Sequence, residues 1–491
     1  MLGNGGKLWL ATLAHILLGQ SSNLQLSALN NIAPFVQSFI FDSVNSTYGH
    51  QLSVEEETAI WSATSAAFYI GATVGSFAYG PIANRIGRKA TSMVVSNAVC
   101  IAGSLVQFVS LQVGLLEPLI VGRFLVGVAG GLAVMLYVFA GECASDPKES
   151  GFTTALVMSS FQLWIAIGTV LNFDFVMGNE SLWVYSFLTP IPLAVAHLLC
   201  AFWLPDSPKH CYIASGTEKA AKTSFRFYQG NTAAWEKQRE SLEEEKSLSA
   251  SASQKSDSLM QILATRHLRW PFLLCLIASF AATSGGVDIT SFYSTPVFVE
   301  FGLTPQQAAL LTVLALQIPS VFICYGVVLG RAIDRLGRKP VYMAGMLLGL
   351  SATLLLCLAG QLRPGWVQTT LLAVALFSMQ QSFYLGPYVV MGVLTVEIVP
   401  HSSRALTAGV GLGASWLSSV LIALYYPPAS VAFGSWAALP LSAISLGAIL
   451  FLWRYLPESK GKSVGDIVAV WKRDGPKRDE NGTRVHPAEK F

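Results

Sequence analysis

Charged residues are scarce in this chain. Of its 491 residues only 12% are charged, whereas 53% are hydrophobic. An average soluble domain carries about 25% charged residues. The deficit excludes an ordinary soluble protein, and the net charge of +3 is too small to indicate a nucleic-acid partner. Much of the chain is therefore expected to face lipid, which makes the bilayer its first predicted partner.

Cysteine and histidine are also few, with seven of each. The cysteines lie in apolar runs or in loops, without the spacing of a zinc site or a disulfide framework. The histidines are scattered, and no catalytic arrangement with Asp or Ser emerges in the apolar runs. We therefore expect no enzyme activity, no metal site and no cofactor.

Long apolar runs dominate what is present. A bilayer-spanning helix needs about 20 apolar residues, and twelve runs are long enough. They form two sets of six, which predicts an all-α membrane protein with twelve transmembrane helices. The predicted spans are 8–30, 59–80, 91–112, 117–140, 153–175, 183–203, 271–298, 307–330, 341–360, 368–396, 405–427 and 432–454.

A polar stretch separates the two sets of spans. Residues 204–268 contain a Glu- and Lys-rich helical pattern followed by a Ser-, Ala- and Gln-rich segment, which is typical of a linker with short helices. The predicted organisation is a six-helix bundle in 1–203, this linker, a second six-helix bundle in 269–456 and a polar tail in 457–491.

The distribution of charge between loops predicts the orientation in the membrane. Lys and Arg gather in alternate short loops, while the opposite loops carry mostly Asp and Glu. Because basic loops stay on the cytosolic side, both termini and the linker are expected in the cytosol. Asn45 begins an Asn-Ser-Thr sequence in the first outside loop and is a candidate for glycosylation. The expected location is the plasma membrane.

Two basic loops are near copies of each other. Residues 80–89 read GPIANRIGRK, and residues 330–339 read GRAIDRLGRK. Each stands between two apolar runs, and they lie about 250 residues apart, half of the chain. A repeat at this spacing predicts two six-helix halves related by pseudo-symmetry.

Further motifs accompany the loops. Arg123 and Glu142 flank the fourth span, and Glu397 ends the tenth. The sixth span is followed by PDSPK at 205–209 and the twelfth by PESKG at 457–461. This set resembles the sugar porter family of the major facilitator superfamily, above all the animal facilitative glucose transporters. The resemblance covers nearly the whole chain. It implies the major facilitator fold, a small-molecule sugar as solute, and alternating access without covalent chemistry.

The resemblance also implies a charged gate. In that family, pairs of carboxylates and arginines at the cytosolic face hold the two halves together when the carrier faces outward. The corresponding residues are Arg88 and Arg338 with Glu142 and Glu397. Two or three pairs of about 1 kcal/mol each suffice to bias an equilibrium of a few kcal/mol. The alternative is that these charges only follow the positive-inside bias. The other gating charges implied by the resemblance are Arg123, Asp334 and Arg404.

The two halves differ at this gate. The family has an arginine seven residues after the carboxylate of the fourth span, and Arg404 keeps this spacing after Glu397. After Glu142 the nearest cation is Lys148, which cannot form a bidentate pair with a carboxylate. The gate of the first half is therefore expected to be looser. Loss of the basic-loop arginine of the second half should disturb gating more than loss of its counterpart.

A neutral sugar needs amides and hydroxyls as hydrogen-bond partners, and an aromatic face for its C–H surface. The resemblance implies Gln162 in the fifth span and the pair Ser415 and Trp416 in the eleventh, with Thr283 of the seventh span as a further candidate. These residues would lie near the midplane between the halves. As an alternative, an intramembrane glutamine can bond another helix and a tryptophan can simply pack.

The seventh span departs from the family pattern. The family usually has two glutamines there, followed by an asparagine. When residues 292–295 are aligned, both glutamines are lost and Asp288 replaces the asparagine. In the tenth span, Gly392 stands where glucose carriers usually have tryptophan. The changes leave a wider pocket with a carboxylate, so the solute stays open between a hexose, a related polyol and an organic acid, in that order.

An acid in a membrane span needs an explanation, because it costs roughly 2.5–3.5 kcal/mol at a helix centre on insertion scales. Asp288 could accept hydrogen bonds from sugar hydroxyls, or it could carry a proton. Proton-coupled sugar porters place their coupling carboxylate in the first span, and this chain has no acid there. Facilitative uniport is therefore favoured. A proton-coupled symporter using Asp288 and a non-transporting sugar sensor remain alternatives, and the oligomeric state stays open.

Overall fold

The computed structural model is helical, with no strand among the residues it describes. Its helices line up as twelve rods that coincide with the twelve predicted spans, so the all-α membrane fold is confirmed. Seven stretches within the described residues are long and apolar enough, by length and composition, to cross a bilayer. The structure describes residues 7–144, 147–213, 216–230, 235–240, 242–243, 259–329, 335–399, 401–460 and 467.

The first half opens with an interrupted rod. Helices α1 (Leu8–Leu18) and α2 (Ala28–Tyr48) are joined by the 3₁₀ turn η1 (Ser21–Gln25), and the second rod is the continuous helix α3 (Val54–Ile86). The other elements of this half are η2 (Ala90–Val95), α4 (Ser96–Val113), α5 (Leu116–Ala133), α6 (Met135–Cys143), α7 (Pro147–Leu171), η3 (Trp183–Leu188) and α8 (Pro190–Trp203).

The second half repeats this plan. Its first rod is again broken, into α13 (Arg266–Ala281) and α14 (Val287–Glu300), and the break ends at Gly286, whose φ of 93° favours glycine. The other elements are α15 (Pro305–Leu311), η4 (Thr312–Gln317), α16 (Ile318–Leu329), α18 (Arg338–Ala359), α19 (Trp366–Leu385), α20 (Pro387–Glu397), α21 (His401–Phe433), η5 (Gly434–Ala438) and α22 (Leu439–Tyr455).

The same capping device starts the second rod of each half. Ser53 accepts a hydrogen bond from the backbone N–H of Glu56, whose side chain accepts one from the backbone N–H of Ser53 in return. Thr304 and Gln307 form the equivalent box at the start of α15. Such boxes satisfy two of the free N–H groups at a helix start. The repeat in capping supports the duplication that the basic loops indicate.

Small residues let the rods of the first half approach closely. A Cβ atom added to Gly127 of α5 would lie 1.9 Å from the carbonyl oxygen of Phe68 in α3. One added to Gly71 of α3 would lie 2.0 Å from the carbonyl oxygen of Phe124 in α5. Close backbone packing of this kind is a main source of helix association in membranes, where apolar burial gives little drive.

Short helices cover one end of the first half. They are α9 (Pro208–Ile213) and α10 (Glu218–Gln229), with α12 (Leu259–Ala264) leading into α13, and all three lie in the predicted linker. The hydroxyl of Tyr228 in α10 donates to the carbonyl of Pro205 at 2.7 Å. The backbone N–H of Lys7 donates to the carbonyl of Phe227 at 2.9 Å. The helix α10 is thus fixed to the bundle.

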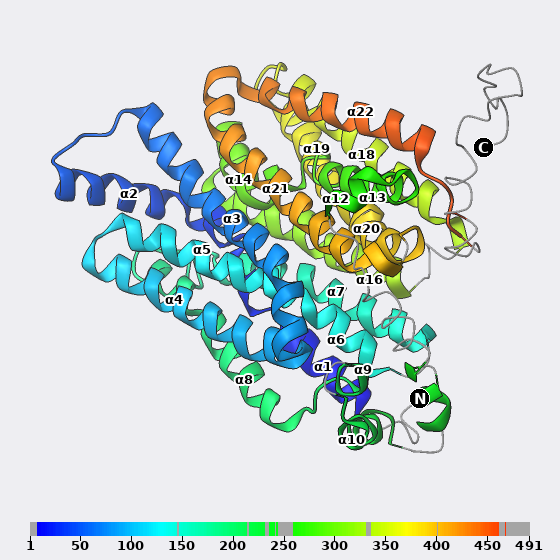
Figure 1. Cartoon of the computed structure of the whole chain (residues 1–491). Coiled ribbons are helices and arrows are strands. Elements are labelled where there is room, and N and C mark those ends of the chain that lie inside the picture. Colours follow the sequence, from blue (N-terminus) through cyan, green and yellow to red (C-terminus); the bar gives the residue numbers. More distant parts are fainter. Residues whose placement is uncertain are drawn as a thin grey trace, which may run out of the picture.

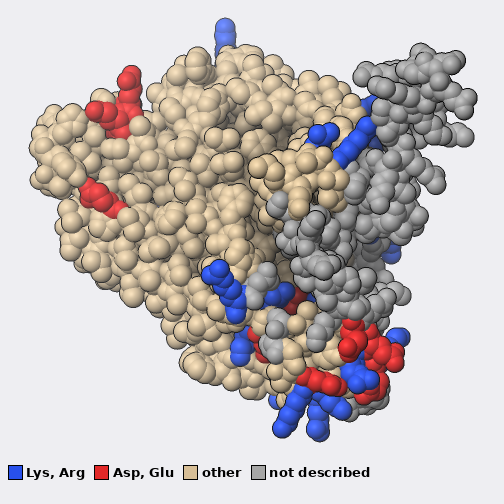
Figure 2. Space-filling model, in the orientation of Figure 1, with Lys and Arg blue, Asp and Glu red and all other residues tan. Residues whose placement is uncertain are grey.

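The two halves lie side by side, with the first half below the second in Figure 1. They meet along α3 and α21, α7 and α16, and α2 and α14. Figure 2 shows a largely uncharged body, with charged side chains gathered at the end where α9 and α10 lie. We refer to this end, which carries the two basic loops, as the charged end.

Candidate functional site

A pair of glutamines joins the two halves in the interior. Gln162 of α7 donates from Nε2 to Oε1 of Gln317 in η4, at 2.8 Å, and both side chains are fully buried. Gln162 Oε1 and Gln317 Nε2 have no hydrogen-bond partner within the described part of the chain. Buried amide atoms without partners are costly, so the pair presents one open acceptor and one open donor to a ligand.

Two further glutamines follow each other on α19. Gln381 donates from Nε2 to the carbonyl of Leu316 at 3.3 Å, next to Gln317 in the chain. Gln380 accepts a hydrogen bond from the hydroxyl of Thr290 in α14. Among the described residues, Gln381 Oε1 and Gln380 Nε2 find no partner. The second half therefore adds amide atoms to the interior from two glutamines of the tenth span that the sequence analysis did not name.

Asp288 lies in the first turn of α14 and is 6% exposed. Its Oδ1 accepts a hydrogen bond from the hydroxyl of Tyr69 in α3, at 3.2 Å, so this bond also crosses between the halves. Its Oδ2 has no hydrogen-bond partner in the portion of the chain described. The acid predicted in the seventh span thus faces the boundary of the halves and keeps one open acceptor.

Aromatic rings form a wall beside these polar groups. Trp416 of α21 lies 5.8 Å from Tyr69 and 6.2 Å from Phe161, measured between ring centroids. Phe161 stacks on Tyr388 of α20 at 5.7 Å, and Tyr388 donates to the carbonyl of Met158 at 2.9 Å. The indole N–H of Trp416 is buried without a partner among the residues the structure describes. The wall supplies both an apolar face and one open donor.

Two other predicted site residues are engaged within the second half. The hydroxyl of Thr283 donates to Ser418 at 2.7 Å, which joins α21 to the break before α14. Ser415 is buried, and its carbonyl accepts a hydrogen bond from Ser419 at 3.4 Å. Neither contact reaches the first half. The structure therefore brings Gln162, Asp288 and Trp416 to the boundary between the halves, and shows Thr283 and Ser415 in local contacts.

A polar network closes the boundary on the side away from the charged end. Asn30 of α2 donates to Ser294 at 2.8 Å and accepts from the backbone N–H of Thr295 at 3.0 Å. The hydroxyl of Thr295 donates to Asn31 at 2.8 Å. All these residues except Asn31 are fully or almost fully buried. The halves are thus bonded together here, between α2 and α14.

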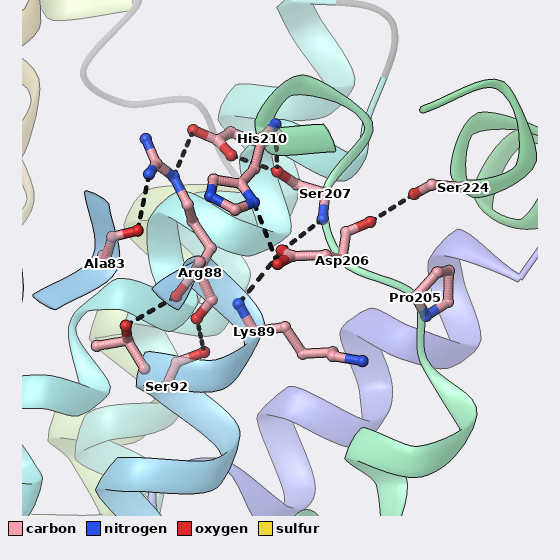
Figure 3. A network of polar contacts seen from close by, with 12 residues as sticks. Ala83, Arg88, Lys89, Ser92, Pro205, Asp206, Ser207, His210 and Ser224 are labelled. Carbon is pink, nitrogen blue, oxygen red and sulfur yellow. Dashed lines mark hydrogen bonds and ion pairs between the residues drawn. The ribbon is translucent and has the colours of Figure 1, made fainter. Parts of the chain in front are cut away.

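At the charged end, the first basic loop lies against two other segments of the first half, the end of α6 and the Pro-Asp-Ser motif. Nε of Arg88 lies 3.5 Å from Glu142 Oε1, and Nη1 donates to the carbonyl of Ala83 at 3.2 Å. The other oxygen of Glu142 accepts from the hydroxyl of Ser207 at 2.6 Å. Figure 3 shows Arg88 and Ser207 pointing toward the same carboxylate, with Asp206 beside Ser207 and directed at the backbone of Lys89. The Pro-Asp-Ser motif therefore works as part of the same cluster as the loop.

Asp206 caps the helix that follows the first basic loop. Its Oδ1 accepts from the backbone N–H of Lys89 at 3.3 Å, and its Oδ2 lies 3.2 Å from Nδ1 of His210 (Figure 3). A carboxylate at a helix start is stabilised by the free N–H groups there. Gly87 has φ 97° and ψ 164°, and a Cβ atom there would lie 2.4 Å from Asp206. Only glycine fits this position.

The second basic loop repeats the cluster with closer contacts. Arg338 donates from Nε to both carboxylate oxygens of Glu397 at 3.0 Å, and from Nη2 to Oε1 at 2.6 Å. Ser459 donates to Glu397 at 2.5 Å. Glu458 accepts from the backbone N–H groups of Arg338 and Lys339 at 3.0 and 3.1 Å. Ser459 and Glu458 therefore match Ser207 and Asp206 of the first half.

Each of these ion pairs lies within one half. Arg88 and Glu142 both belong to the first six rods, and Arg338 and Glu397 to the second six. In this structure the pairs tie together helix ends of one bundle, because the basic loop and the fourth span of a half are neighbours. Two gating candidates of the second half remain. Asp334 lies outside the described residues, and so does the side chain of Arg404.

Arg123 stands apart from the other predicted gating charges. It is fully buried in α5, and its Nη1 donates to the carbonyl of Gln25 at 3.0 Å. Its guanidinium also lies over the ring of Phe68, 5.5 Å from the centroid. At 1.5 Å per residue, Arg123 is about 28 Å from Glu142 along the fourth rod. It therefore braces the first half internally, far from the charged end.

Sequence reasoning missed Gln317, Gln380, Gln381 and Tyr69. A signal was present for the glutamines, since amides inside apolar runs are rare and tend to face the interior of a bundle. Tyr69 carried no such signal, because tyrosines are common in membrane helices. Only the packing of α3 against α14 shows that its hydroxyl meets Asp288.

Comparison with known proteins decides the family. The family model described as "Sugar (and other) transporter" matches residues 21–471. The chain belongs to this family. It is a multi-pass membrane transporter and not an enzyme, and it carries solute by the alternating access of the major facilitator fold.

Curated relatives of this transporter include human solute carrier family 2, facilitated glucose transporter member 9. The two are 28% identical over 455 residues, which cover 91% of this chain and 82% of the relative. Mouse member 7 is 26% identical, with 92% of this chain and 87% of the relative covered. Horse member 5 is also 26% identical, with 94% and 90% covered. The similarity therefore extends over nearly the whole length of these proteins.

Solved structures show the same fold. The major facilitator proton:xylose symporter XylE bound to 6-bromo-6-deoxy-D-glucose superposes with a TM-score of 0.72 at 19% identity, covering 94% of this chain and 99% of that one. An inward-open structure of XylE from E. coli gives 0.71 at 18% identity, covering 94% and 100%. The predicted major facilitator fold is thus confirmed.

Proposed function

We propose that this transporter carries a hexose or a related polyol by facilitative uniport. The observation that supports this most is a set of buried polar atoms, at and beside the boundary of the halves, that have no hydrogen-bond partner among the described residues. They are Gln162 Oε1, Gln317 Nε2, Gln380 Nε2, Gln381 Oε1, Asp288 Oδ2 and Trp416 Nε1.

The chemistry of this set fits a polyhydroxy solute. Three of the six atoms are acceptors and three are donors, and each hydroxyl of a sugar can both donate and accept. The amides and the indole are neutral, which suits a neutral solute better than a charged one. The rings of Phe161, Trp416 and Tyr388 offer the apolar face that the C–H surface of a sugar prefers. A hexose of this kind is also consistent with the printed names of the relatives.

Alternating access supplies the rest of the proposal. Opening away from the charged end requires the Asn30–Ser294 bonds to break, whereas opening at the charged end requires the contact of Tyr388 with Met158 to break. The clusters around Arg88 and Arg338 keep each half rigid during the exchange.

The charged end faces the cytosol by the positive-inside bias, which puts both termini there and Asn45, exposed at the end of α2, outside. We place the protein in the plasma membrane, with Asn45 glycosylated.

Uniport is preferred over proton symport because Asp288 already has a neutral hydroxyl partner and the first span carries no acid. The open Oδ2 of Asp288 is the observation that favours the second candidate, a symporter that protonates this oxygen.

The test is uptake of labelled glucose, fructose, inositol, urate and dehydroascorbate into liposomes that contain the purified protein. We expect saturable entry of a hexose or polyol that stops at equal concentrations inside and outside, with or without a pH gradient. Accumulation above equilibrium driven by an inward proton gradient would overturn uniport in favour of symport. Binding of a sugar without saturable flux of any solute would overturn transport in favour of a sensor.

A further inference from the structure

We propose that His15, His197 and Asn97 form a proton-binding site in the interior of the first half, and that proton uptake there slows the carrier. The three side chains come from α1, α8 and α4, respectively, and α8 packs against both of the other helices (Figure 1). The inference goes beyond the proposed function, because it concerns when the carrier moves and not which solute it binds.

Two imidazoles meet directly inside the bundle. His15 Nδ1 lies 3.1 Å from His197 Nε2, and the planes of the two rings are 87° apart. On the other side of His197, its Nδ1 lies 2.9 Å from Asn97 Nδ2. All three side chains are at most 2% exposed. No third metal-ligating side chain joins the two histidines among the described residues, so the ligand that suits this pair is a proton.

The carbonyl of Met93 fixes which atoms of the cluster carry protons. Asn97 Nδ2 lies 2.6 Å from this oxygen, which can only accept, so the amide nitrogen and not the amide oxygen points there. The same nitrogen donates to His197 Nδ1, which is therefore an acceptor. A neutral imidazole has one N–H group, so His197 carries its proton on Nε2 and donates it to His15. The hydrogen bonds of the cluster are thus complete while both imidazoles are neutral.

An additional proton disrupts this chain of bonds. On His15 Nδ1 it would face the proton of His197 Nε2, and on His197 Nδ1 it would face the N–H of Asn97. Moving the His197 proton from Nε2 to Nδ1 does not relieve the conflict, because Met93 holds the amide of Asn97 in place. Two donors cannot bond each other, so proton uptake requires α1, α4 and α8 to move apart at this joint.

The helices around the cluster supply no charge that would offset such a proton. Among the residues that the structure describes, the only ionisable group that acts on either imidazole is the other imidazole. Phe139 of α6 covers His15, with ring centroids 5.2 Å apart. A buried charge without a partner is costly, so the protonated cluster is unstable in this packing.

The other titratable groups nearby are neutral or lie at the helix ends. The neutral ones on α4, α6, α8 and α10 are Cys100, Tyr137, Cys143, Cys200 and Tyr228. The charged ones on α6, α7 and α10 lie at the charged end and are Glu142, Glu149, Glu218, Lys219, Lys222 and Arg226. Lys7 and Lys89 precede α1 and η2 at the same end, and Arg123 of α5 donates to Gln25.

The cluster lies near the charged end, so the cytosol supplies the proton in the proposed orientation. At 1.5 Å per residue, His15 is about 10 Å from Leu8 at the start of α1. His197 is about 9 Å from Trp203 at the end of α8. The helix α1 is the first part of a rod whose second part, α2, bonds the other half through Asn30. Loosening α1 within its own half therefore disturbs the rigid movement that alternating access requires.

The direction of the pH effect follows from the neutral arrangement. In the closed joint both imidazoles are neutral, whereas in an opened joint each can bind a proton. Proton uptake thus favours the opened joint, and its effect grows as the pH falls through the usual imidazole range near about 6.5. Between pH values of about 7.5 and about 5.5, one such group shifts the equilibrium about 10-fold toward the opened joint.

The experiment combines transport and stability. The first measurement is initial uptake of D-glucose or D-fructose, whichever enters faster, by liposomes with the same pH on both sides. Wild-type uptake should fall at least about 3-fold from pH about 7.5 to about 5.5. The second measurement is the unfolding temperature of the purified protein in detergent, which should fall over the same range because the opened joint binds more protons.

The variant that isolates the cluster is His15→Asn combined with His197→Gln. An amide offers an accepting oxygen and a donating nitrogen, as a neutral imidazole does, but it does not titrate in this range. Uptake by the double variant should change less than about 1.5-fold over the same pH range, and its unfolding temperature should fall less than that of the wild type. His197→Gln alone should respond to an intermediate degree, and it serves if the double variant is poorly folded.

A matched control is His210→Gln. His210 lies at the charged end, where its Nδ1 is 3.2 Å from Asp206 Oδ2. The variant removes a histidine that can titrate and leaves the cluster intact. Its uptake should therefore fall with pH as much as that of the wild type.

Two results would overturn the inference while leaving the proposed function intact. One is a wild-type protein whose uptake and unfolding temperature depend on pH no more than those of the double variant. The other is loss of the pH response in His210→Gln, which would assign the response to the charged end. Absence of uptake of any hexose or polyol overturns the proposed function instead, and the unfolding temperatures then still test the proton site.

Discussion

Arg338 donates to both carboxylate oxygens of Glu397, whereas the equivalent Arg88 approaches one oxygen of Glu142 at 3.5 Å. The two copies of the basic loop therefore differ in the geometry of their contact with the glutamate. A bidentate pair of arginine and carboxylate is stronger and more directional than a single long contact. The looser first-half gate that the sequence analysis expects stays a prediction, because each of these two pairs lies within one half.

The first prediction concerns this difference. Arg338→Gln should lower the maximal transport rate about 5–10-fold at matched surface expression, and Arg88→Gln only about 2–3-fold, since partly exposed pairs are weakened by solvent. The measurement is initial uptake at saturating solute. Arg335→Gln, at an exposed position of the same loop, is the control and should transport normally. Equal losses in the Arg88 and Arg338 variants would contradict the prediction.

The second prediction concerns the glycines of the basic loops. Gly87 and Gly337 have φ of 97° and 102°, and a Cβ atom would lie 2.4 Å from Asp206 and 2.7 Å from Glu458, respectively. Replacement of either by alanine should destabilise the fold by about 1–3 kcal/mol. Thermal unfolding of the purified protein in detergent measures this.

Gly80 provides the matched control for that experiment. It lies in the same helix as the first loop, and a Cβ atom added there would meet nothing within 4 Å. Gly80→Ala should leave the unfolding temperature unchanged or slightly higher, because alanine favours helix. If Gly87→Ala unfolded at the same temperature as Gly80→Ala, the capping role of Asp206 would be wrong.

The third prediction concerns the glutamine pair at the boundary of the halves. Gln162→Ala and Gln317→Ala should each raise the half-saturating solute concentration about 10-fold, and the double variant should be little worse than either. The reason is that the two amides act as one unit, joined at 2.8 Å. Uptake kinetics of the three variants test this.

Gln107→Ala is the control for the single and double variants of Gln162 and Gln317. It is also fully buried and donates to Gln25 at 2.9 Å, but both belong to the first half. Gln107→Ala should lower the amount of folded protein and leave the half-saturating concentration near the wild-type value. Additive effects of the Gln162 and Gln317 variants would show that the amides do not share a ligand.

The fourth prediction concerns Asp288 and the proton. Because the uniport model uses Asp288 as a hydrogen-bond acceptor, Asp288→Asn should still carry solute down its gradient, with affinity reduced about 10-fold. Counterflow exchange, which needs no net driving force, measures this at several pH values. A wild-type protein that takes up protons together with the solute, and an Asp288→Asn protein that does not, would favour symport instead.

Much of the fold was accessible from the sequence, for a physical reason. Lipid demands long apolar helices, so the apolar runs predict the twelve rods. The contact of Arg88 with Glu142 follows from short loops that bring neighbouring helix ends together. The cross-boundary contacts could not be predicted in this way. The meeting of Gln162 with Gln317 depends on how two separately folded halves are set against each other, which local patterns do not encode.

The same limit applies to Thr283 and Ser415, whose roles in the site stay predictions. Thr283 and Ser415 are polar and lie in the expected spans, but a one-residue rotation on a helix changes its direction by 100°. Their described contacts lead back into the second half. Asp288 was found because a lone acid in a span is rare, whereas its partner Tyr69 is of a common type.

The clusters at the charged end fasten each half to the segment that leaves it. Ser207 binds Glu142 just after the sixth rod, and Ser459 binds Glu397 just after the twelfth. In each half, the segment that follows the last helix is thereby bonded to the end of the fourth rod of the same half. Because each half has such a cluster of its own, a carrier produced as two pieces that are divided within the predicted linker should assemble, and solute uptake by the two co-expressed pieces would measure this.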